Sequence, residues 1–363
     1  MSFFRPNVDQ LHGYAPGEQP QDSGWITLTT NENPYPPSPK VIEALQQRIQ
    51  GRLNIYPDPL ATDFRRLVAE RFNVDPDWVI PANGSDENLT LIMRCFIDPH
   101  ERVVYPYPSY ILYETLVQLQ GGTFDRLLLK PDWTWDPTEA AKLIERAKLT
   151  IIPNPNSPSG NRWSDAEILS LIPPQGLLVL DEAYGDFADK PHRAELLHSE
   201  RGNRIIITRS FSKSFSMAGI RLGFALAHPD LIAGMRKMKD SYNCDTLSLA
   251  AGTAALQDWD WMEANCRKVA ATRNRLTAEL RALGFHVPDS QTNFVWAQHP
   301  THCAKEIYEN LKTRKILVRL MGFNGVHWPD AKGNLHPVTG LRISIGTDAE
   351  TDALLTALKP LLA

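Results

Sequence analysis

Short apolar runs recur at regular intervals through the middle of the chain. Several of them are continuous rather than alternating, which is typical of parallel strands that are covered on both faces. Between most of them lie stretches long enough for a crossover helix, such as residues 165–172 (DAEILSLI). The pattern therefore predicts an α/β fold with a mostly parallel, doubly wound sheet. The expected strands are 102–106 (RVVYP), 149–154 (LTIIPN), 177–181 (LLVLD), 204–210 (RIIITRS) and 223–227 (GFALA).

The two ends of the chain depart from this central pattern. Residues 1–30 are rich in Pro, Gly and polar residues, so we expect an irregular N-terminal arm there. Ser38 followed by Pro39 predicts a helix start, and residues 62–72 carry apolar side chains at helical spacing. After about residue 250 a long helical stretch precedes a few strands and a last helix. We divide the chain into the arm (1–30, packed with the small domain), a large domain (31–250) and a small α+β domain (251–363).

Composition and charge exclude several classes of protein. A formal net charge of -4 argues against a nucleic-acid binder, which would carry a basic surplus. No apolar run reaches the roughly 18 residues that a membrane span needs, and the N-terminus lacks the apolar core of a signal peptide. We therefore expect a cytoplasmic protein that binds neither membranes nor nucleic acids. The four cysteines form no C-x-x-C pair, which argues against a zinc site. Zincin, P-loop and dinucleotide-binding motifs are missing from the sequence.

Polar side chains gather where the expected strands end. In open parallel sheets, ligands bind beyond the carboxyl ends of the strands. Taken alone, Asp181 suits a turn or a helix cap, and Lys213 suits an exposed surface. Their position on successive strand ends favours one shared site. The side chains at or just after a strand end are Asn154, Asn156 and Ser157 for strand 149–154, Asp181 and Tyr184 for strand 177–181, and Ser210, Ser212 and Lys213 for strand 204–210.

This set of groups matches the chemistry of one cofactor. A desolvated lysine can form a Schiff base with an aldehyde, and a carboxylate can keep a pyridine nitrogen protonated. Hydroxyl groups and Arg221 near the lysine can bind a phosphate, as can Gly84 and Ser85 at a helix start. Pyridoxal 5'-phosphate combines an aldehyde, a pyridine, a phenol and a phosphate.

With these motifs the chain resembles the fold-type-I, pyridoxal-phosphate-dependent aminotransferases, and within them the histidinol-phosphate aminotransferases. The resemblance covers nearly the whole chain and implies a large domain with a doubly wound sheet plus a smaller α+β domain. The motifs that carry it are LTTNENPYPPSP, NIYPDP, NGSDE, PYPSYILY, NPNSPSG, DEAYGDF, SFSKSFSMAGIRLGF, TNFVWA, ILVR and LRISIGT.

The resemblance implies a role for each matching residue. Lys213 forms the Schiff base and moves the proton, while Asp181 pairs with the pyridine nitrogen and Tyr184 with the phenolic oxygen. Tyr56 reaches the cofactor of a second subunit, which implies a homodimer, although Tyr56 and Tyr110 also suit packed loop aromatics. The resemblance implies that Tyr110 stacks on the ring and that the phosphate is bound by Gly84, Ser85, Asp86, Ser210, Ser212 and Arg221.

One motif departs from the family pattern. The family has Asn-Pro-Thr-Gly where this chain has Ser157-Pro158-Ser159-Gly160, and that asparagine binds the phenolic oxygen. Either Ser157 supplies a weaker donor or Asn156 turns in to replace it. We favour Asn156, because an amide reaches further than a hydroxyl group.

Two arginines lie in strand-like runs of the small domain. Burying an arginine is costly unless an anion or a salt bridge meets it, and both explanations stay open for Arg319 and Arg342. The resemblance implies that Arg342 binds the substrate carboxylate, that Arg319 and Tyr14 bind the substrate phosphate, and that Asn33 lies in the substrate site. The implied reaction is transamination between histidinol phosphate and 2-oxoglutarate, giving imidazole acetol phosphate and glutamate.

Residues 320–340 leave a second substrate open. This segment is longer than we expect for the family and carries Phe323, His327 and Trp328. These aromatic residues would suit an aromatic amino-acid aminotransferase of the same fold. A phosphothreonine-type decarboxylase is a further alternative, because the sequence does not reveal how the substrate carboxylate is oriented.

Overall fold

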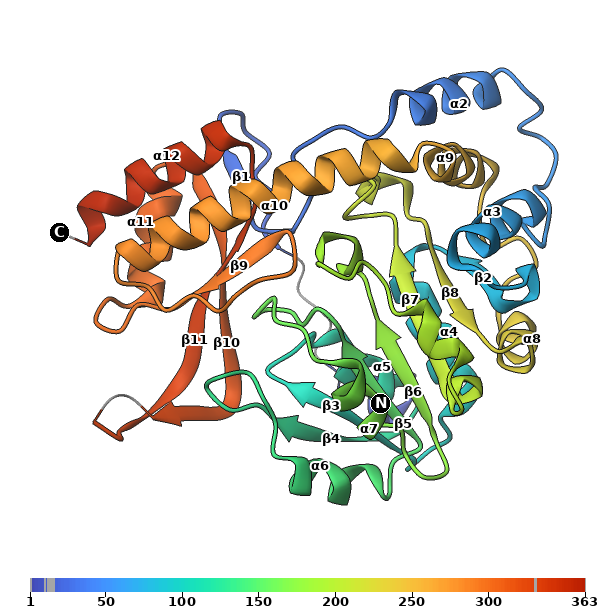
Figure 1. The fold of residues 1–363 in the computed structure, drawn as a ribbon, viewed down its shortest axis with the longest axis horizontal. Helices are drawn as coiled ribbons and strands as arrows, with labels where there is room; N and C mark the ends of the chain where they lie inside the picture. Colours follow the sequence, from blue (N-terminus) through green and yellow to red (C-terminus); the bar gives the residue numbers. More distant parts are fainter. Residues whose placement is uncertain (1, 10, 12–16, 330–331, 363) are drawn as a thin grey trace.

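The computed structural model describes residues 2–9, 11, 17–329 and 332–362. Two sheets form the frame, and the long helix α10 runs from one to the other (Figure 1). Across the larger sheet the order is β2 (Val79–Ala82), β8 (Gly223–Ala227), β7 (Ile205–Ser210), β6 (Leu177–Asp181), β5 (Leu149–Pro153), β3 (Arg102–Tyr107) and β4 (Thr123–Leu128). The smaller sheet has the order β1 (Ile26–Leu28), β10 (Ile316–Pro329), β11 (Leu335–Ser344) and β9 (Phe294–Ala297).

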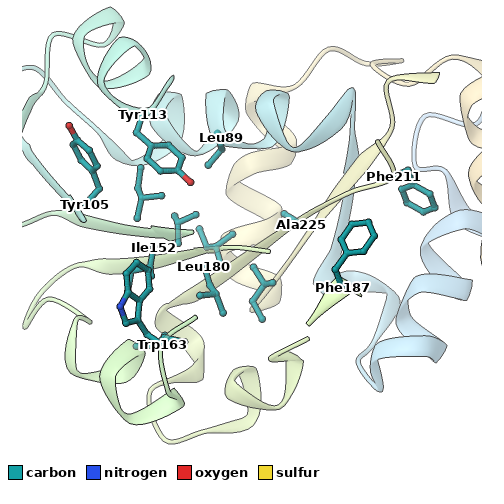
Figure 2. Packing of buried hydrophobic residues seen from close by; sticks show 14 of the residues in the cluster. Leu89, Tyr105, Tyr113, Ile152, Trp163, Leu180, Phe187, Phe211 and Ala225 are labelled. Carbon is teal, nitrogen blue, oxygen red and sulfur yellow. The ribbon is translucent and has the colours of Figure 1, made fainter. Parts of the chain in front are cut away.

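The larger sheet is parallel except at β8, which is antiparallel to both β2 and β7. This confirms the α/β class and all five expected strands, but the run GFALA forms the antiparallel one. The strands β5, β7 and β8 are buried at every residue, so their apolar runs need no alternation. Figure 2 shows Ile152 and Leu180 in this core, with helical segments on both sides of the strands.

Helices connect and cover these strands. Ser38 caps α2 by accepting from the backbone N–H of Lys40, as the Ser-Pro pair predicted. The first helices are α1 (Pro6–Asp9), α2 (Pro39–Ile49), α3 (Thr62–Phe72), α4 (Gly84–Phe96), α5 (Leu112–Leu119), α6 (Pro137–Ile144), α7 (Asp165–Ser170) and α8 (Pro229–Met238). They are followed by α9 (Thr246–Leu256), α10 (Trp259–Ala282), α11 (Ala304–Thr313) and α12 (Asp348–Leu358).

The observed packing concerns two boundaries of the expected domain division, the one after the arm and the one at residue 250. Strand β1, which falls inside the expected arm, pairs in parallel with β10 and so belongs to the smaller sheet. Residue 250 lies inside α9, a helix that packs on α2 and α3, and the domain boundary expected there stays a prediction. The N-terminal segment also contacts the large domain, because Arg5 and Asn7 donate to backbone carbonyls of α5.

Candidate active site

A cavity of about 270 Å³ lies at the carboxyl ends of β5, β6 and β7, facing the smaller sheet. Most of the residues singled out in the sequence lie on its wall, although they come from segments far apart in the chain. The expected residues on the wall are Ser85, Asp86, Tyr110, Ser157, Asp181, Tyr184, Ser210, Ser212, Lys213, Arg221, Arg319 and Arg342.

Lys213 follows β7 and points into this cavity. Its Nζ donates to the backbone carbonyl of Thr30 at 2.9 Å. Burial is the main cause that lowers the pKa of Lys213 to about 8, and the positive charge of Arg342 lowers it further. The amine therefore becomes neutral at a lower pH than an ordinary lysine does, as a nucleophile or a base requires.

Hydrogen bonds from Asn33 and to Asp186 hold the segment that carries Lys213. Asn33 Nδ2 donates to the carbonyl oxygens of Lys213 and Ser214, each at 3.2 Å. Ser214 Oγ donates to Asp186 at 2.6 Å, and Asp186 pairs with the buried Arg209. Asn33 is not on the cavity wall, and its amide holds the lysine segment. Its place in the substrate site stays a prediction.

Asp181 ends β6 on the floor of the cavity. Its Oδ2 accepts from the hydroxyl of Tyr113 at 2.8 Å, and its Oδ1 accepts from Thr208 Oγ1 and from the N–H of Ala183, each at 3.2 Å. Burial raises the pKa of Asp181 to about 6, and the hydrogen bond from Tyr113 is the strongest effect that opposes this rise. The carboxyl group is therefore ionised above that pH and can bind a protonated ring nitrogen.

The other end of the cavity suits an anion. Gly84 begins the thirteen-residue helix α4 with a φ of +81°, and a Cβ placed there would lie 2.9 Å from Arg221 Nη2. Arg221 Nη1 donates to Ser212 Oγ at 3.1 Å, and Arg221 Nη2 lies 3.9 Å from Asp86 Oδ2. A helix N-terminus, a guanidinium group and hydroxyl groups together make a phosphate site. Gly84 is not on the cavity wall. It contributes because its missing side chain lets Arg221 approach the start of α4 closely.

Asn156 and Ser157 have different surroundings at the β5 end. Asn156 is fully buried, its Nδ2 donates to Ser159 Oγ at 2.8 Å, and its Oδ1 accepts from Ser109 Oγ at 3.1 Å. Ser157 instead lies on the cavity wall, where its Oγ accepts from Arg342 Nη1 at 3.4 Å. The amide of Asn156 is engaged elsewhere, so Ser157 is the residue placed to meet a ligand.

Arg319 and Arg342 are direct neighbours across the β10–β11 pairing. Both lie on the cavity wall, and Arg342 Nη2 also donates to the carbonyl of Thr29 at 2.9 Å. Two neighbouring guanidinium groups can bind two anionic groups, or they can bind one anion together.

The expected tyrosines take different positions. Tyr110 lies on the wall, its hydroxyl donates to Asp86 at 3.4 Å, and its ring meets Tyr113 edge-on at 5.5 Å. Tyr56 is 75% exposed and stacks on Tyr242 at 4.3 Å, away from the cavity wall of its own chain. Tyr14 lies outside the described residues.

Residues 320–329 and 335–340 belong to the paired strands β10 and β11. Phe323 is buried against Tyr107, with ring centroids 5.6 Å apart. Trp328 Nε1 donates to the carbonyl of Leu129 at 3.0 Å, and its ring meets Trp133 at 4.9 Å. Among the described residues of 320–340 none lies on the cavity wall, and these contacts give Phe323 and Trp328 a packing role. The influence of the segment on substrate choice stays a prediction.

Sequence reasoning missed several residues of the wall. The five missed polar residues all lie within motifs that were already recognised: four in LTTNENPYPPSP and Tyr113 in PYPSYILY. Their contacts depend on chain segments that are distant in sequence. The missed polar residues are Thr29, Thr30, Asn31, Glu32 and Tyr113.

Within the described ranges, no group of three or more His, Cys, Asp or Glu side chains could hold a metal ion. The same ranges contain no helix that is long and apolar enough to cross a membrane.

Comparison with known proteins adds to this geometry. A family model described as "Aminotransferase class I and II" matches residues 23–358. Histidinol-phosphate aminotransferase of Rhodopirellula baltica is 45% identical over 97% of this chain and 94% of its own. Histidinol-phosphate aminotransferase 1 of a Nostoc species is 39% identical over 99% of this chain and 98% of its own. A crystal structure of the Sinorhizobium meliloti enzyme of that name, in complex with pyridoxal-5'-phosphate, superposes with a TM-score of 0.85 at 25% identity, covering 100% of this chain and 98% of that one.

Proposed function

The chain belongs to the class I and II aminotransferases, and on this premise we propose that it transfers the amino group of histidinol phosphate to 2-oxoglutarate. The products are imidazole acetol phosphate and glutamate. Relatives at 39% to 45% identity over nearly the full chain carry the name of this activity, which supports the proposal.

The pairing of Arg319 with Arg342 on the cavity wall is the observation that carries this substrate choice. Histidinol phosphate carries one phosphate and no carboxylate, whereas glutamate carries two carboxylates. A site that takes both in turn needs two cationic groups close to Lys213. The two arginines meet this need, with Arg342 at the substrate carboxylate and Arg319 at the phosphate.

Pyridoxal phosphate fits the residues at the other side of the cavity, and it supplies an aromatic ring that withdraws electrons from the substrate carbon. Asp181 would hold the ring nitrogen, Tyr184 and Ser157 the phenolic oxygen, and Tyr110 the ring face. The phosphate would be held by Ser85, Asp86, Ser210, Ser212, Arg221 and the backbone at Gly84.

Lys213 binds the cofactor and acts on the substrate proton. Its Nζ removes the proton from the substrate carbon that bears the amino group. Burial favours this step, because it lowers the pKa of Lys213 to about 8 and so keeps part of the amine neutral.

A homodimer completes the proposal. Tyr56 is mostly exposed and is not on its own cavity wall, which supports a role at the cofactor of a second subunit. Mixing a Tyr56→Phe variant with a Lys213→Ala variant tests this, because only a shared dimer regains an intact site. Light scattering that reports a monomer would contradict it. The cytoplasmic location stays a prediction.

Steady-state kinetics tests the choice of substrate. We expect kcat/KM for histidinol phosphate to exceed that for phenylalanine and tyrosine. A higher value for the aromatic amino acids would keep the chemistry and replace the substrate. The observation that raised this second candidate, the aromatic residues of 320–340, does not favour it now, because Phe323 and Trp328 pack on the large domain.

A further inference from the structure

The backbone N–H, the backbone carbonyl and both ends of the side-chain amide of Asn31 all form hydrogen bonds. It is 1% exposed and has a φ of +57°. Its backbone N–H donates to Ser344 Oγ at 2.9 Å, and its carbonyl accepts from Asn293 Nδ2 at 2.8 Å. Ser344 Oγ donates its own hydrogen to Asn31 Oδ1 at 2.9 Å. With Oδ1 bonded to Ser344, the NH2 group of Asn31 is directed to the other side.

The NH2 group of Asn31 meets the tyrosine of the cavity wall. Nδ2 donates to the hydroxyl oxygen of Tyr184 at 2.9 Å. A hydroxyl group has a single hydrogen, and an oxygen that accepts from Asn31 directs that hydrogen elsewhere. Accepting a hydrogen bond also makes the hydroxyl a stronger donor, because neighbouring hydrogen bonds polarise one another.

We propose that Asn31 is a positioning residue that aims the hydroxyl hydrogen of Tyr184 at the phenolic oxygen of the cofactor. The inference rests on the proposed function, since it takes Tyr184 as the partner of that oxygen. Asn31 acts through Tyr184.

The same contacts connect Tyr184 to the smaller sheet. Ser344 lies two residues after Arg342 on β11, so the two side chains share one face of the strand. Asn293 precedes β9 of the same sheet, whereas Tyr184 follows β6 of the larger one. Asn31 is thus a hydrogen-bonded link between the strand that carries the substrate arginine and the tyrosine at the cofactor.

The sign of the effect follows from where the negative charge lies. The phenolate charge of the bound cofactor stabilises the proton on the nitrogen that joins it to Lys213. A hydrogen bond donated by Tyr184 stabilises that phenolate after the proton has left, so it lowers the pKa of this nitrogen. Removing the hydrogen bond from Asn31 to Tyr184 should therefore raise the pKa of the nitrogen that joins the cofactor to Lys213.

The experiment is a pH titration of the visible absorbance of the holoenzyme. Asn31→Gly removes the amide without straining the left-handed backbone. We expect it to raise the midpoint by about 0.5 to 1 pH unit, the equivalent of one hydrogen bond. In a Tyr184→Phe background the same substitution should change nothing further. Ser344→Ala should give a smaller rise, because the amide stays but loses its anchor.

Asn154→Ala is the matched control. Asn154 is also a buried asparagine, but its side chain bonds to the backbone of Trp163 outside the cavity. This variant should unfold more easily and keep the wild-type midpoint. A rise of equal size for Asn31→Gly with and without Tyr184, or no rise at all, would overturn the proposal.

The Tyr184→Phe variant alone separates two kinds of failure. If it raises the midpoint while Asn31→Gly does not, the cofactor arrangement stands and the role of Asn31 fails. If it leaves the midpoint unchanged, the assignment of Tyr184 to the phenolic oxygen fails, and the inference with it.

Discussion

The hydroxyl of Tyr113 donates a 2.8 Å hydrogen bond to Asp181, the carboxylate on the cavity floor. Both side chains are buried, and burial raises the pKa of each. Tyr113 therefore stays protonated as a permanent donor, and its hydrogen bond favours the ionised form of Asp181. This pair ties α5 to the end of β6 at the point where a ring nitrogen would bind.

Tyr113→Phe should weaken binding of pyridoxal phosphate by about tenfold, the value of one hydrogen bond to a charged group. The loss should be greater at pH 6 than at pH 8, because the variant's Asp181 has a pKa above the wild-type value of about 6. Titration of the apoenzyme with cofactor measures both.

Tyr105→Phe provides the control for this variant. Tyr105 is equally buried, but its hydroxyl bonds to Glu114 instead of Asp181 (Figure 2 shows both rings). Cofactor affinity should stay at the wild-type value in this variant. Equal losses in the two variants would mean that Tyr113 matters only for packing.

Capture of the cofactor by the apoenzyme should depend on pH through Lys213. Only the neutral amine attacks an aldehyde, so the rate should rise with pH and level off above about 8. Arg342→Gln should move this midpoint upward, because the variant lacks a positive charge that lowers the pKa of Lys213. Stopped-flow absorbance follows the reaction, and a midpoint near the ordinary lysine value would contradict the account.

Ser157 and Asn156 should respond differently to alanine. Ser157→Ala should raise the pH midpoint of the bound cofactor, because it removes a donor from the cavity wall. Asn156→Ala should instead lower the free energy of unfolding by about 1–3 kcal/mol, since it leaves buried partners unsatisfied. Urea denaturation and absorbance titration of both variants decide the matter, and a shifted midpoint for Asn156→Ala alone would restore the original expectation.

Phe323→Ala should destabilise the protein without changing its substrate preference. A buried phenylalanine costs about 3–5 kcal/mol when it is truncated, and Phe323 packs between Tyr107 and Trp296. The ratio of kcat/KM for histidinol phosphate to that for phenylalanine should stay within about twofold, a change worth under 0.5 kcal/mol. The exposed His327 is the control position, and a large change in the ratio for Phe323→Ala would return the hairpin to the substrate site.

The sequence was most informative where burial dictates the residue type. Strands β5, β6 and β7 appear as continuous apolar runs, and the polar residues after them converge because parallel strands end at one edge of the sheet. Strand β2 contains Pro81, and the edge strand β4 has exposed residues, so neither shows a clear apolar run. Their existence follows from pairing with neighbouring strands.

The residues that the sequence did not reveal depend on contacts between distant segments. Asn31 is positioned by Ser344 and Tyr184, and no local pattern reveals such a contact. The reach of an amide favours Asn156 in the sequence, but its side chain bonds to Ser109 and Ser159 in the fold. The packing of Phe323 and Trp328 on the large domain also depends on the β10–β11 pairing, which the sequence alone does not show.

A single-turnover reaction is the most direct test of histidinol phosphate as the amino donor. The holoenzyme is mixed with histidinol phosphate in the absence of any 2-oxo acid, and the visible absorbance of the lysine-bound cofactor is followed together with the formation of imidazole acetol phosphate. The account predicts stoichiometric conversion that is faster than with phenylalanine or tyrosine and that is strongly slowed in Arg319→Gln. Faster conversion by the aromatic amino acids, or an unchanged rate in Arg319→Gln, would contradict it.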